Sequence, residues 1–312
     1  MPRTGRKWIA LVAGPLAFAA LLGLDSPLSA WGEYGARPAL AAGLTLWMAI
    51  WWISEAVRIE RTACLPLLVL PFSNVHGVGF AANLRGALLP YVDPYIFLFL
   101  GGMGIAAAMQ QWNLHRRIAL AVMRAVGTDP RRLLFGLLLA TAFVSLWISN
   151  TATAAMMFPI GLAVIAEFER ETGKRLTHYG AALMLAVAYG SNIGGIGTKI
   201  GTVPSAQLAG FLAQRGNDVS FLEFMSIGLP FVALLLPVAW LALWRVGRAD
   251  APTAEVGRIA LSREGARLGR LQRGEQVVGA VFLAAATLWI LGKPITDALR
   301  ARGLESGDLG SQ

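Results

Sequence analysis

Five small polar side chains interrupt a long apolar run in the stretch Ser145-Leu146-Trp147-Ile148-Ser149-Asn150-Thr151-Ala152-Thr153-Ala154-Ala155-Met156-Met157-Phe158-Pro159. These five are Ser145, Ser149, Asn150, Thr151 and Thr153. No charged residue lies between Arg132 and Glu167. Inside a bilayer, a polar interruption is tolerated only where protein buries it or where it lines a cavity, and there it commonly forms a site for ions or substrate. The stretch therefore predicts a binding site within a membrane.

The same interruption divides the apolar run into two short arms. Residues 133–148 and 152–166 give about 16 and about 15 residues of apolar type, each fewer than the roughly 20 that cross a bilayer as a helix. Basic residues flank both arms: Arg131, Arg132, Arg170, Lys174 and Arg175. Because positive charge favours the cytoplasmic face, the pattern predicts a re-entrant hairpin over about 131–168. Its tip would lie near the midplane, where free N–H groups suit a carboxylate and free carbonyls suit sodium.

A second region, residues 179–213, is crowded with residues that disfavour a helix. They are Gly190, Gly194, Gly195, Gly197, Gly201 and Pro204. Glycine costs about 1 kcal/mol relative to alanine in a helix interior, and proline about 3 kcal/mol. This composition predicts a broken helix whose unwound carbonyls face an ion. The alternative is a close-packing face, because Gly190/Gly194 and Gly197/Gly201 have the required spacing.

Polar residues accompany this break. Asn192 and Thr198 are predicted to line the cavity, with Lys199 and Pro204 nearby. Lys199 is the single charged residue of the region, and a buried ammonium is costly unless it is paired or reaches water. Lys199 therefore either complements an anionic substrate or extends toward the external side.

The composition is that of a polytopic membrane protein. Hydrophobic residues make up 56% of the 312 residues and charged residues 14%. The net charge of +9 does not indicate nucleic-acid binding, because about 20 of the 27 Lys and Arg fall in five predicted cytoplasmic segments. We expect a multi-pass protein with a cytoplasmic N-terminus, in contact with the lipid bilayer and not with nucleic acid.

The reactive residue types do not indicate an enzyme or a resident cofactor. The single cysteine, Cys64, excludes an intramolecular disulfide and a multi-cysteine metal site. His76, His115 and His178 fall in predicted loops without metal-ligand spacing, and we interpret them as solvated. Neither a histidine nor a carboxylate stands near Ser149 in the sequence to act as its base.

The first 126 residues are predicted to carry scaffold helices. Residues 1–61 hold an N-terminal helix, with cleavage after Leu28-Ser29-Ala30 as the alternative, and a second helix over 40–53 whose tryptophans pack or anchor. Residues 62–126 hold a short third span over 62–75, a fourth span opened by Asp93-Pro94, and an amphipathic helix over 113–126 along the inner membrane surface.

Residues 127–312 divide into three further predicted parts. Residues 127–213, with the hairpin and the broken helix, are the predicted transport part. Residues 214–274 hold a sixth span over 221–244 and a basic linker over 245–273. Residues 275–312 begin a further span over 277–290, whose Leu288-Trp289-Ile290 weakly echoes Trp51-Trp52-Ile53, as the start of an internal repeat would.

These motifs resemble those of a known family. The Ser149-Asn150-Thr151 tip, Ser145 one turn earlier and the run from Ser191 to Thr198 resemble the divalent anion/sodium symporter family, which carries dicarboxylates, citrate or sulfate. The resemblance extends to about residue 295. It implies an all-α fold that forms the N-terminal inverted repeat of an elevator-type transporter, a homodimer in the bacterial inner membrane. The chain departs from the family pattern at Thr202-Val203-Pro204-Ser205 and at Lys199.

The resemblance also implies roles for individual residues. Ser149, Asn150 and Thr151 would bind a substrate carboxylate, and sodium would be the coupling ion. Its ligands would be Ser145, Ser149, Asn150 and a backbone carbonyl from Gly194-Gly195. These are neutral oxygen ligands, which suit an ion that must also be released. Succinate or malate is the expected substrate, although carboxylate and sulfate are both met by such donors.

A second Ser-Asn-Thr motif does not occur in the 312 residues. We therefore expect a truncated member of the family. The alternatives are a half-transporter completed by another chain and a membrane scaffold protein that does not transport.

Overall fold

The computed structural model describes residues 3–23, 37–73, 79–92 and 94–301. Helices make up all the regular structure in these ranges, which contain no strand, so the predicted all-α class is confirmed. The chain divides between Ile96 and Phe97 into two compact units, and each is described by itself. The cleavage motif at residues 28–30, His76 and Asp93 lie outside the described residues.

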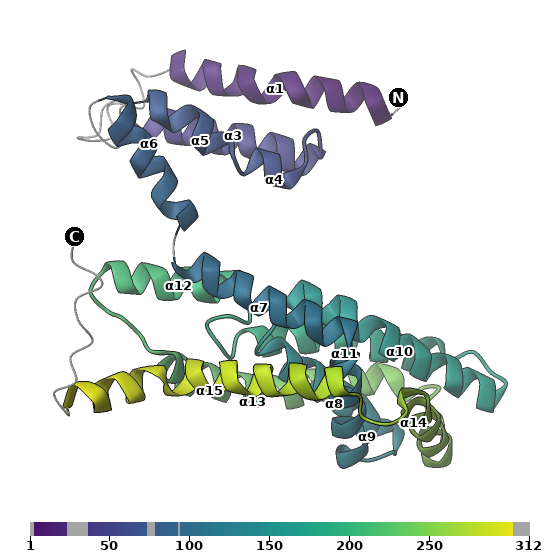
Figure 1. Ribbon diagram of the computed structural model, residues 1–312. Helices are drawn as coiled ribbons and strands as arrows, with labels where there is room; N and C mark the ends of the chain where they lie inside the picture. Colours follow the sequence, from purple (N-terminus) through teal and green to yellow (C-terminus); the bar gives the residue numbers. More distant parts are fainter. Residues whose placement is uncertain (1–2, 24–36, 74–78, 93, 302–312) are drawn as a thin grey trace. The chain divides into compact units, whose positions relative to one another are not determined.

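The first unit is built on two helices that pack against each other, α1 (Arg3–Gly23) and α3 (Arg37–Ser54) (Figure 1). The Trp51 indole N–H donates to the Leu11 carbonyl at 3.2 Å, and the Trp47 ring stands edge-on to Trp51. A Cβ atom at Gly14 would lie 2.4 Å from the Trp47 ring, so a glycine is needed there. Trp47 and Trp51 are packing residues, as predicted.

The predicted third span over residues 62–75 is not one continuous helix in the part that the structure describes. Three short helices occupy the region instead: α4 (Ile59–Thr62), α5 (Leu65–Val69) and the 3-10 helix η1 (Leu70–Phe72). Pro66 and Pro71 each lie in the first two positions of a new helix, where a missing N–H costs nothing. The prolines therefore start elements and do not sit within one long helix. The unit continues with α6 (Phe80–Leu88) and η2 (Leu89–Val92).

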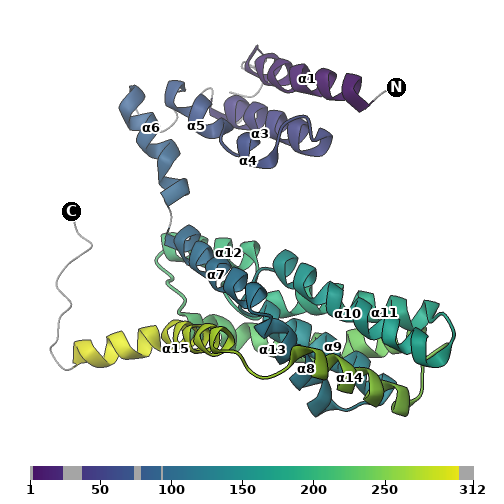
Figure 2. The same ribbon diagram turned by 45° about the vertical axis from the view of Figure 1, so that its right-hand side comes forward.

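The second unit carries the two regions singled out by the sequence. Its helices are α7 (Pro94–Gln111), of which it holds the part from Phe97, α8 (Leu114–Val126), α9 (Pro130–Ser145), α10 (Asn150–Thr172), α11 (Thr177–Gly195), α12 (Val203–Gln214), α13 (Phe221–Gly247), α14 (Ala254–Leu268) and α15 (Arg273–Ala301) (Figures 1 and 2). The turn at residues 146–149 joins α9 to α10. The break at residues 196–202 separates α11 from α12, so the predicted broken helix is present.

Helix α9 lies at the centre of the second unit. It is apolar on all sides, as expected of a buried helix, and it packs on α8, α11 and α13. Leu133, Leu137, Met157, Phe168 and Tyr179 are fully buried in the cluster that these helices form with α10 and α14. Asp129 caps α9 by accepting a hydrogen bond from the Arg131 N–H at 3.0 Å, and Pro130 occupies its first position.

Close packing accompanies the break and is not its alternative. A Cβ atom at Gly190 would lie 2.7 Å from the Leu138 carbonyl oxygen, and one at Gly194 would lie 2.2 Å from that of Ala142. Both contacts join α11 to the backbone of α9. Small residues at four-residue spacing therefore bring these helices together just before α11 ends.

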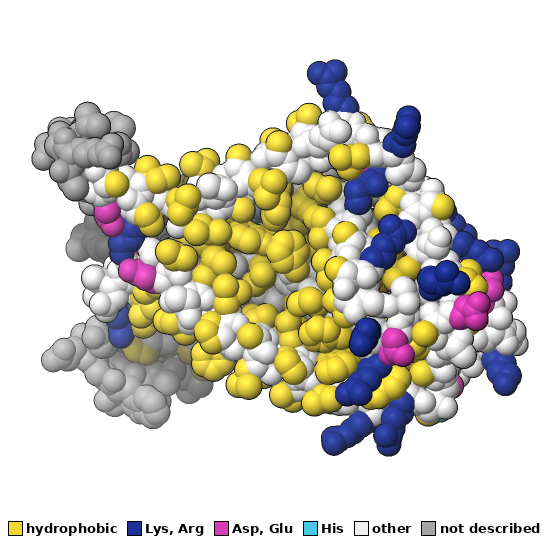
Figure 3. All heavy atoms as spheres, turned by 90° about the horizontal axis from the view of Figure 1, so that it is seen from below, with side chains coloured by type: hydrophobic (Ala, Val, Ile, Leu, Met, Phe, Trp, Pro, Cys, Tyr) yellow, Lys and Arg dark blue, Asp and Glu magenta, His cyan; other side chains and the backbone are white. Residues whose placement is uncertain are grey.

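Four stretches of the described chain are long and apolar enough to cross a membrane. They are Phe80–Gln111, which comprises α6, η2 and α7 and passes through residue 93 outside the described ranges, and Asn150–Thr172, Phe221–Gly247 and Arg273–Ala298. The second arm of the predicted hairpin is therefore longer than expected, because its helix continues through Glu167 to Thr172. Figure 3 shows hydrophobic side chains over the middle of one face of the molecule and Lys and Arg gathered at one end.

At that basic end, 15 residues of the predicted linker over 245–273 form α14. One expectation there needs correction. His115 is not solvated: it lies in α8, 5% exposed, with Nδ1 3.1 Å from the Met109 carbonyl oxygen. Burial lowers the pKa of His115, and the charge of Arg116 acts in the same direction.

Candidate functional site

The turn between α9 and α10 is organised by the hydroxyl groups that the sequence singled out. Ser149 caps α10: its side chain accepts a hydrogen bond from the Ala152 N–H at 3.5 Å. Ser145 closes α9 and is fully buried. Its hydroxyl lies 2.6 Å from the Ser191 carbonyl oxygen in α11, so it joins the turn to the helix that precedes the break.

The break is tied to the same turn. The Thr198 hydroxyl donates to the Leu146 carbonyl and accepts from the Gly201 N–H at 3.0 Å. Thr198 is fully buried, and a Cβ atom at Gly197 would lie 2.3 Å from Leu146. The two interruptions, about 50 residues apart in the chain, therefore form one structure.

The Asn150 amide lies where the turn and the break meet. Its inner terminal atom is 2.9 Å from the Ser191 carbonyl oxygen, 3.0 Å from the Ser145 hydroxyl and 3.2 Å from the Gly201 carbonyl oxygen. With the amide nitrogen at this position, the two N–H groups of Asn150 face these three oxygens as acceptors. With the amide oxygen there instead, four oxygens would face one another around a single hydroxyl hydrogen. The second arrangement is one that a cation would stabilise.

Glycine allows the backbone to approach this amide closely. A Cβ atom at Gly195 would lie 2.1 Å from the Asn150 amide oxygen. At Gly201 it would lie 2.5 Å from the Gly195 carbonyl oxygen and 2.8 Å from that of Ser145. A side chain at Gly195 would displace the Asn150 amide, and one at Gly201 would push apart the backbone of the break and the end of α9.

The structure therefore brings together part of the predicted set. Ser145, Asn150 and Gly195 lie in contact, and Asn192 reaches the Asn150 amide at 3.1 Å from the exposed side of α11. Thr151 is exposed in the first turn of α10. The backbone carbonyls within 3.2 Å of the Asn150 amide come from Ser191 and Gly201, whereas the sequence analysis assigned that role to Gly194-Gly195.

The other residues that were predicted to line the site are either exposed or engaged in contacts with other groups. The Gly194 carbonyl accepts from the Gly197 N–H at 2.9 Å. Pro204 lies in the first turn of α12 and is exposed. Lys199 is 6% exposed, and its ammonium donates to the Val219 carbonyl in the loop before α13. That contact favours the second interpretation of Lys199, as a cation directed away from the Ser-Asn-Thr tip.

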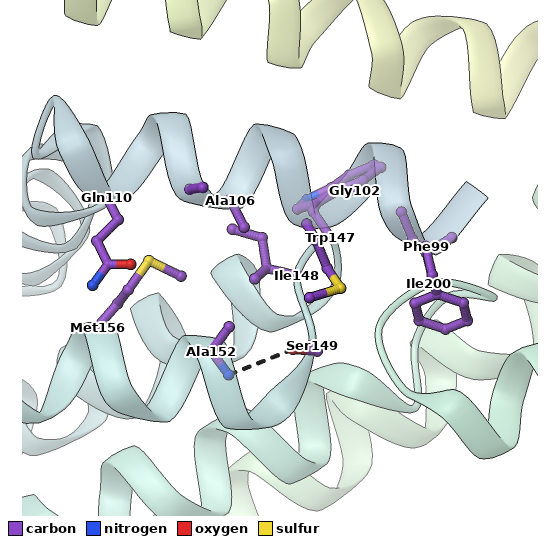
Figure 4. A pocket seen from close by; sticks show the side chains of 12 residues that line it. Phe99, Gly102, Ala106, Gln110, Trp147, Ile148, Ser149, Ala152, Met156 and Ile200 are labelled. Carbon is purple, nitrogen blue, oxygen red and sulfur yellow. Dashed lines mark hydrogen bonds between the residues drawn. The ribbon is translucent and has the colours of Figure 1, made fainter. Parts of the chain in front are cut away.

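A cavity of about 150 Å³ adjoins the α9–α10 turn at Ser149. Figure 4 shows Gly102, Ala106 and Gln110 of α7 facing Ser149 and Met156 across it. The lining is mostly apolar, with Ser149 and Gln110 as polar side chains. The sequence analysis missed α7 as a wall of the site, because an apolar helix without polar spacing carries no signal for such a role.

Comparisons with known proteins agree with these features. Residues 49–302 match the family model described as citrate transporter. A sodium-dependent dicarboxylate transporter of Staphylococcus saprophyticus is 38% identical over 289 residues, which cover 90% of this chain and 54% of the relative. A sodium-dependent dicarboxylate transporter of Staphylococcus aureus is 36% identical over 298 residues, which cover 93% of this chain and 55% of the relative.

The chain thus spans about half the length of the curated relatives that it matches. The family model nevertheless covers most of the chain, from the end of α3 to the end of α15. The chain belongs to the citrate transporter family and is a divalent anion/sodium symporter-type member, in a family of transporters and not of enzymes.

Proposed function

We propose that this chain contributes to sodium-coupled symport of a divalent anion across the bacterial inner membrane, with its N-terminus in the cytoplasm. The convergence of Ser145, Asn150 and the Ser191 and Gly201 carbonyls is the observation that carries this proposal. The substrate class is a C4-dicarboxylate such as succinate or malate, because the two Staphylococcus relatives are named as sodium-dependent dicarboxylate transporters.

Sodium is the ion that this cluster suits. Its oxygens come from a hydroxyl, an amide and backbone carbonyls, so the site carries no net charge of its own. Hard neutral oxygens bind alkali cations and still release them, as a transport cycle requires. With the Asn150 amide oxygen inward, the bound ion replaces the hydrogen-bond donor that the cluster otherwise lacks.

The substrate carboxylate would lie beside this ion. Ser149, Asn150 and Thr151 form the start of α10, where free N–H groups and the helix dipole favour an anion. Sodium next to a carboxylate offsets part of the repulsion and desolvation that each would meet alone. This mutual stabilisation is the proposed physical basis of coupling.

An elevator motion fits the arrangement. The α9–α10 turn and the α11–α12 break are joined by hydrogen bonds, so they would move as one body past a scaffold. We propose that a homodimer supplies the scaffold and that the substrate site is completed outside residues 145–204.

The test is sodium-dependent uptake of succinate by the complete protein in vesicles. We expect Ser145→Ala to raise the sodium concentration needed for half-maximal uptake about tenfold, since one ion ligand worth about 1.4 kcal/mol is lost. Thr141→Ala is the matched control: Thr141 lies one turn earlier in α9 and bonds only its own helix, at Leu137, at 2.7 Å. Equal sodium dependence in both variants and the parent would contradict the site assignment.

A further inference from the structure

The outer end of the Asn150 amide meets a second amide. Its inner terminal atom faces the oxygens of Ser145, Ser191 and Gly201, whereas its outer terminal atom lies 3.1 Å from a terminal atom of the Asn192 side chain. Asn192 belongs to α11 and is exposed. The two amides therefore connect a closed cluster of oxygens with the open side of α11.

The orientation of one amide in this pair determines the orientation of the other. At 3.1 Å, a hydrogen bond needs an NH2 group on one side and an oxygen on the other. Two facing oxygens would repel each other, and two facing NH2 groups would leave both without an acceptor. When Asn150 turns over, Asn192 must therefore turn over as well.

Two arrangements of the pair satisfy this requirement. When Asn150 directs its NH2 group inward, its oxygen accepts from Asn192, which then presents its own oxygen on the exposed side. When Asn150 directs its oxygen inward toward a cation, its NH2 group donates to Asn192, which then presents an NH2 group on the exposed side. Because a carboxylate only accepts hydrogen bonds, it finds a donor in the second arrangement alone.

The surroundings of Asn192 suit contact with a ligand. Among the described residues, its side chain has one hydrogen bond, the one to Asn150. Thr151, which follows Asn150 in the chain, is exposed as well. Tyr189 and Ile196, about one turn before and after Asn192 in α11, are 48% and 41% exposed. This side of the helix is therefore open around the outer end of the Asn192 amide.

We propose that Asn150 and Asn192 form an amide relay, in which bound sodium turns Asn150 over, Asn192 follows, and Asn192 then donates to the substrate carboxylate. The inference rests on the proposed function and adds a residue to its substrate site. It also gives a reason, besides direct attraction between ion and carboxylate, for the substrate to bind after sodium. By linkage, the substrate tightens sodium binding by the same factor.

Titration calorimetry on the complete protein tests the relay, with sodium titrated with and without saturating succinate, and succinate with and without saturating sodium. In the parent, we expect each ligand to tighten the binding of the other. Asn192→Ala should bind sodium alone nearly as the parent does, because Asn150 stays free to turn over. It should reduce the mutual tightening about tenfold, since one hydrogen bond to a carboxylate is lost.

Asn192→Asp separates the relay from a merely structural role. A carboxylate accepts only, so it should hold the Asn150 NH2 group outward and the Asn150 oxygen inward. We expect this variant to bind sodium alone about threefold more tightly and to bind succinate more weakly at saturating sodium. Tyr189→Asp is the matched control, because it places the same charge about one turn earlier on the same exposed side of α11.

Two results would overturn the relay and leave the proposed symport standing. One is mutual tightening in Asn192→Ala equal to that of the parent. The other is equal strengthening of sodium binding by Asn192→Asp and Tyr189→Asp, because this would reflect charge alone. Absence of mutual tightening in the parent itself would instead overturn the proposed symport, and the relay with it.

Discussion

The two ends of helix α10 deal with polar groups in opposite ways. At its start, Ser145, Asn150 and backbone carbonyls form a neutral cluster between closely packed glycines. At its end, Glu167 and Glu171 both bond Arg263 of α14, and the same basic end holds the Glu264 pairs. Neutral oxygens suit an ion that comes and goes, whereas paired buried charges suit a contact that stays closed. The proposed ion site therefore lies apart from the charged contacts that hold α10 to α14.

The contrast between the two ends of α10 requires that both ends of the predicted hairpin lie on the same side of the membrane. In a Cys64→Ser background, we expect Arg132→Cys and Arg175→Cys to react from the cytoplasmic side with a membrane-impermeant maleimide, because both positions are exposed at the basic end. Labelling of the two variants in oriented vesicles checks this. Reaction from opposite sides would make α9 and α10 two spanning helices.

Close packing at the neutral cluster should produce the largest change in stability. Gly194→Ala places a Cβ atom 2.2 Å from the Ala142 carbonyl oxygen, so the helices must separate, at a cost of about 3 kcal/mol. Thermal unfolding in detergent measures the effect. Gly292→Ala in α15 is the control, because a Cβ atom there meets nothing within 4 Å. Equal melting temperatures for the two variants would show that the contact between α9 and α11 is not tight.

Removing a carboxylate from the charged end should lower the unfolding free energy less than Gly194→Ala does. Glu264→Gln leaves Arg116 and Arg267 without their shared carboxylate, and we expect the chain to lose about 2 kcal/mol of unfolding free energy, since both arginines keep access to water. Glu255→Gln, an exposed carboxylate of the same helix, should change it by less than about 0.5 kcal/mol. A neutral result for Glu264→Gln would mean that α14 is held by apolar contacts alone.

The smallest change in stability is expected at Asp250, in the loop after α13. Its carboxylate accepts hydrogen bonds from the His178 and Tyr179 N–H groups, at 2.8 and 2.6 Å, and so caps α11. Burial raises the pKa of Asp250, but these bonds outweigh it and hold the pKa below its usual value. A lowered carboxyl pKa stabilises the fold above the unfolded-state pKa, and this contribution is lost as the pH falls through the folded-state pKa.

Asp250→Asn should therefore cost about 0.5 kcal/mol at pH 7 and progressively less as the pH falls toward 2. Melting temperatures of parent and variant across this range provide the measurement. A difference that stays constant down to pH 2 would contradict the assignment of the charge on Asp250 as the cause. Asp218→Asn serves as the control for carboxylates outside this cap.

Local chemistry explains the parts of the fold that the sequence predicted correctly. Ser149 before an apolar helix and glycines next to Pro204 each bias the backbone within a few residues. The turn and the break could therefore be found without knowing what they touch. Within residues 62–75, an apolar composition alone does not reveal that Pro66 and Pro71 restart the helix.

The amino-acid sequence alone thus specified an all-α chain with apolar spans, two polar interruptions and a basic side, because periodicity, capping and composition act over one or two helical turns. Tertiary structure decided that the Ser191 and Gly201 carbonyls face Asn150, that Asp250 caps α11, and that α14 covers the arginines of α8. Backbone carbonyls are the same for every residue, and pairs such as Arg116–Glu264 lie 148 residues apart. Only packing selects which of them meet.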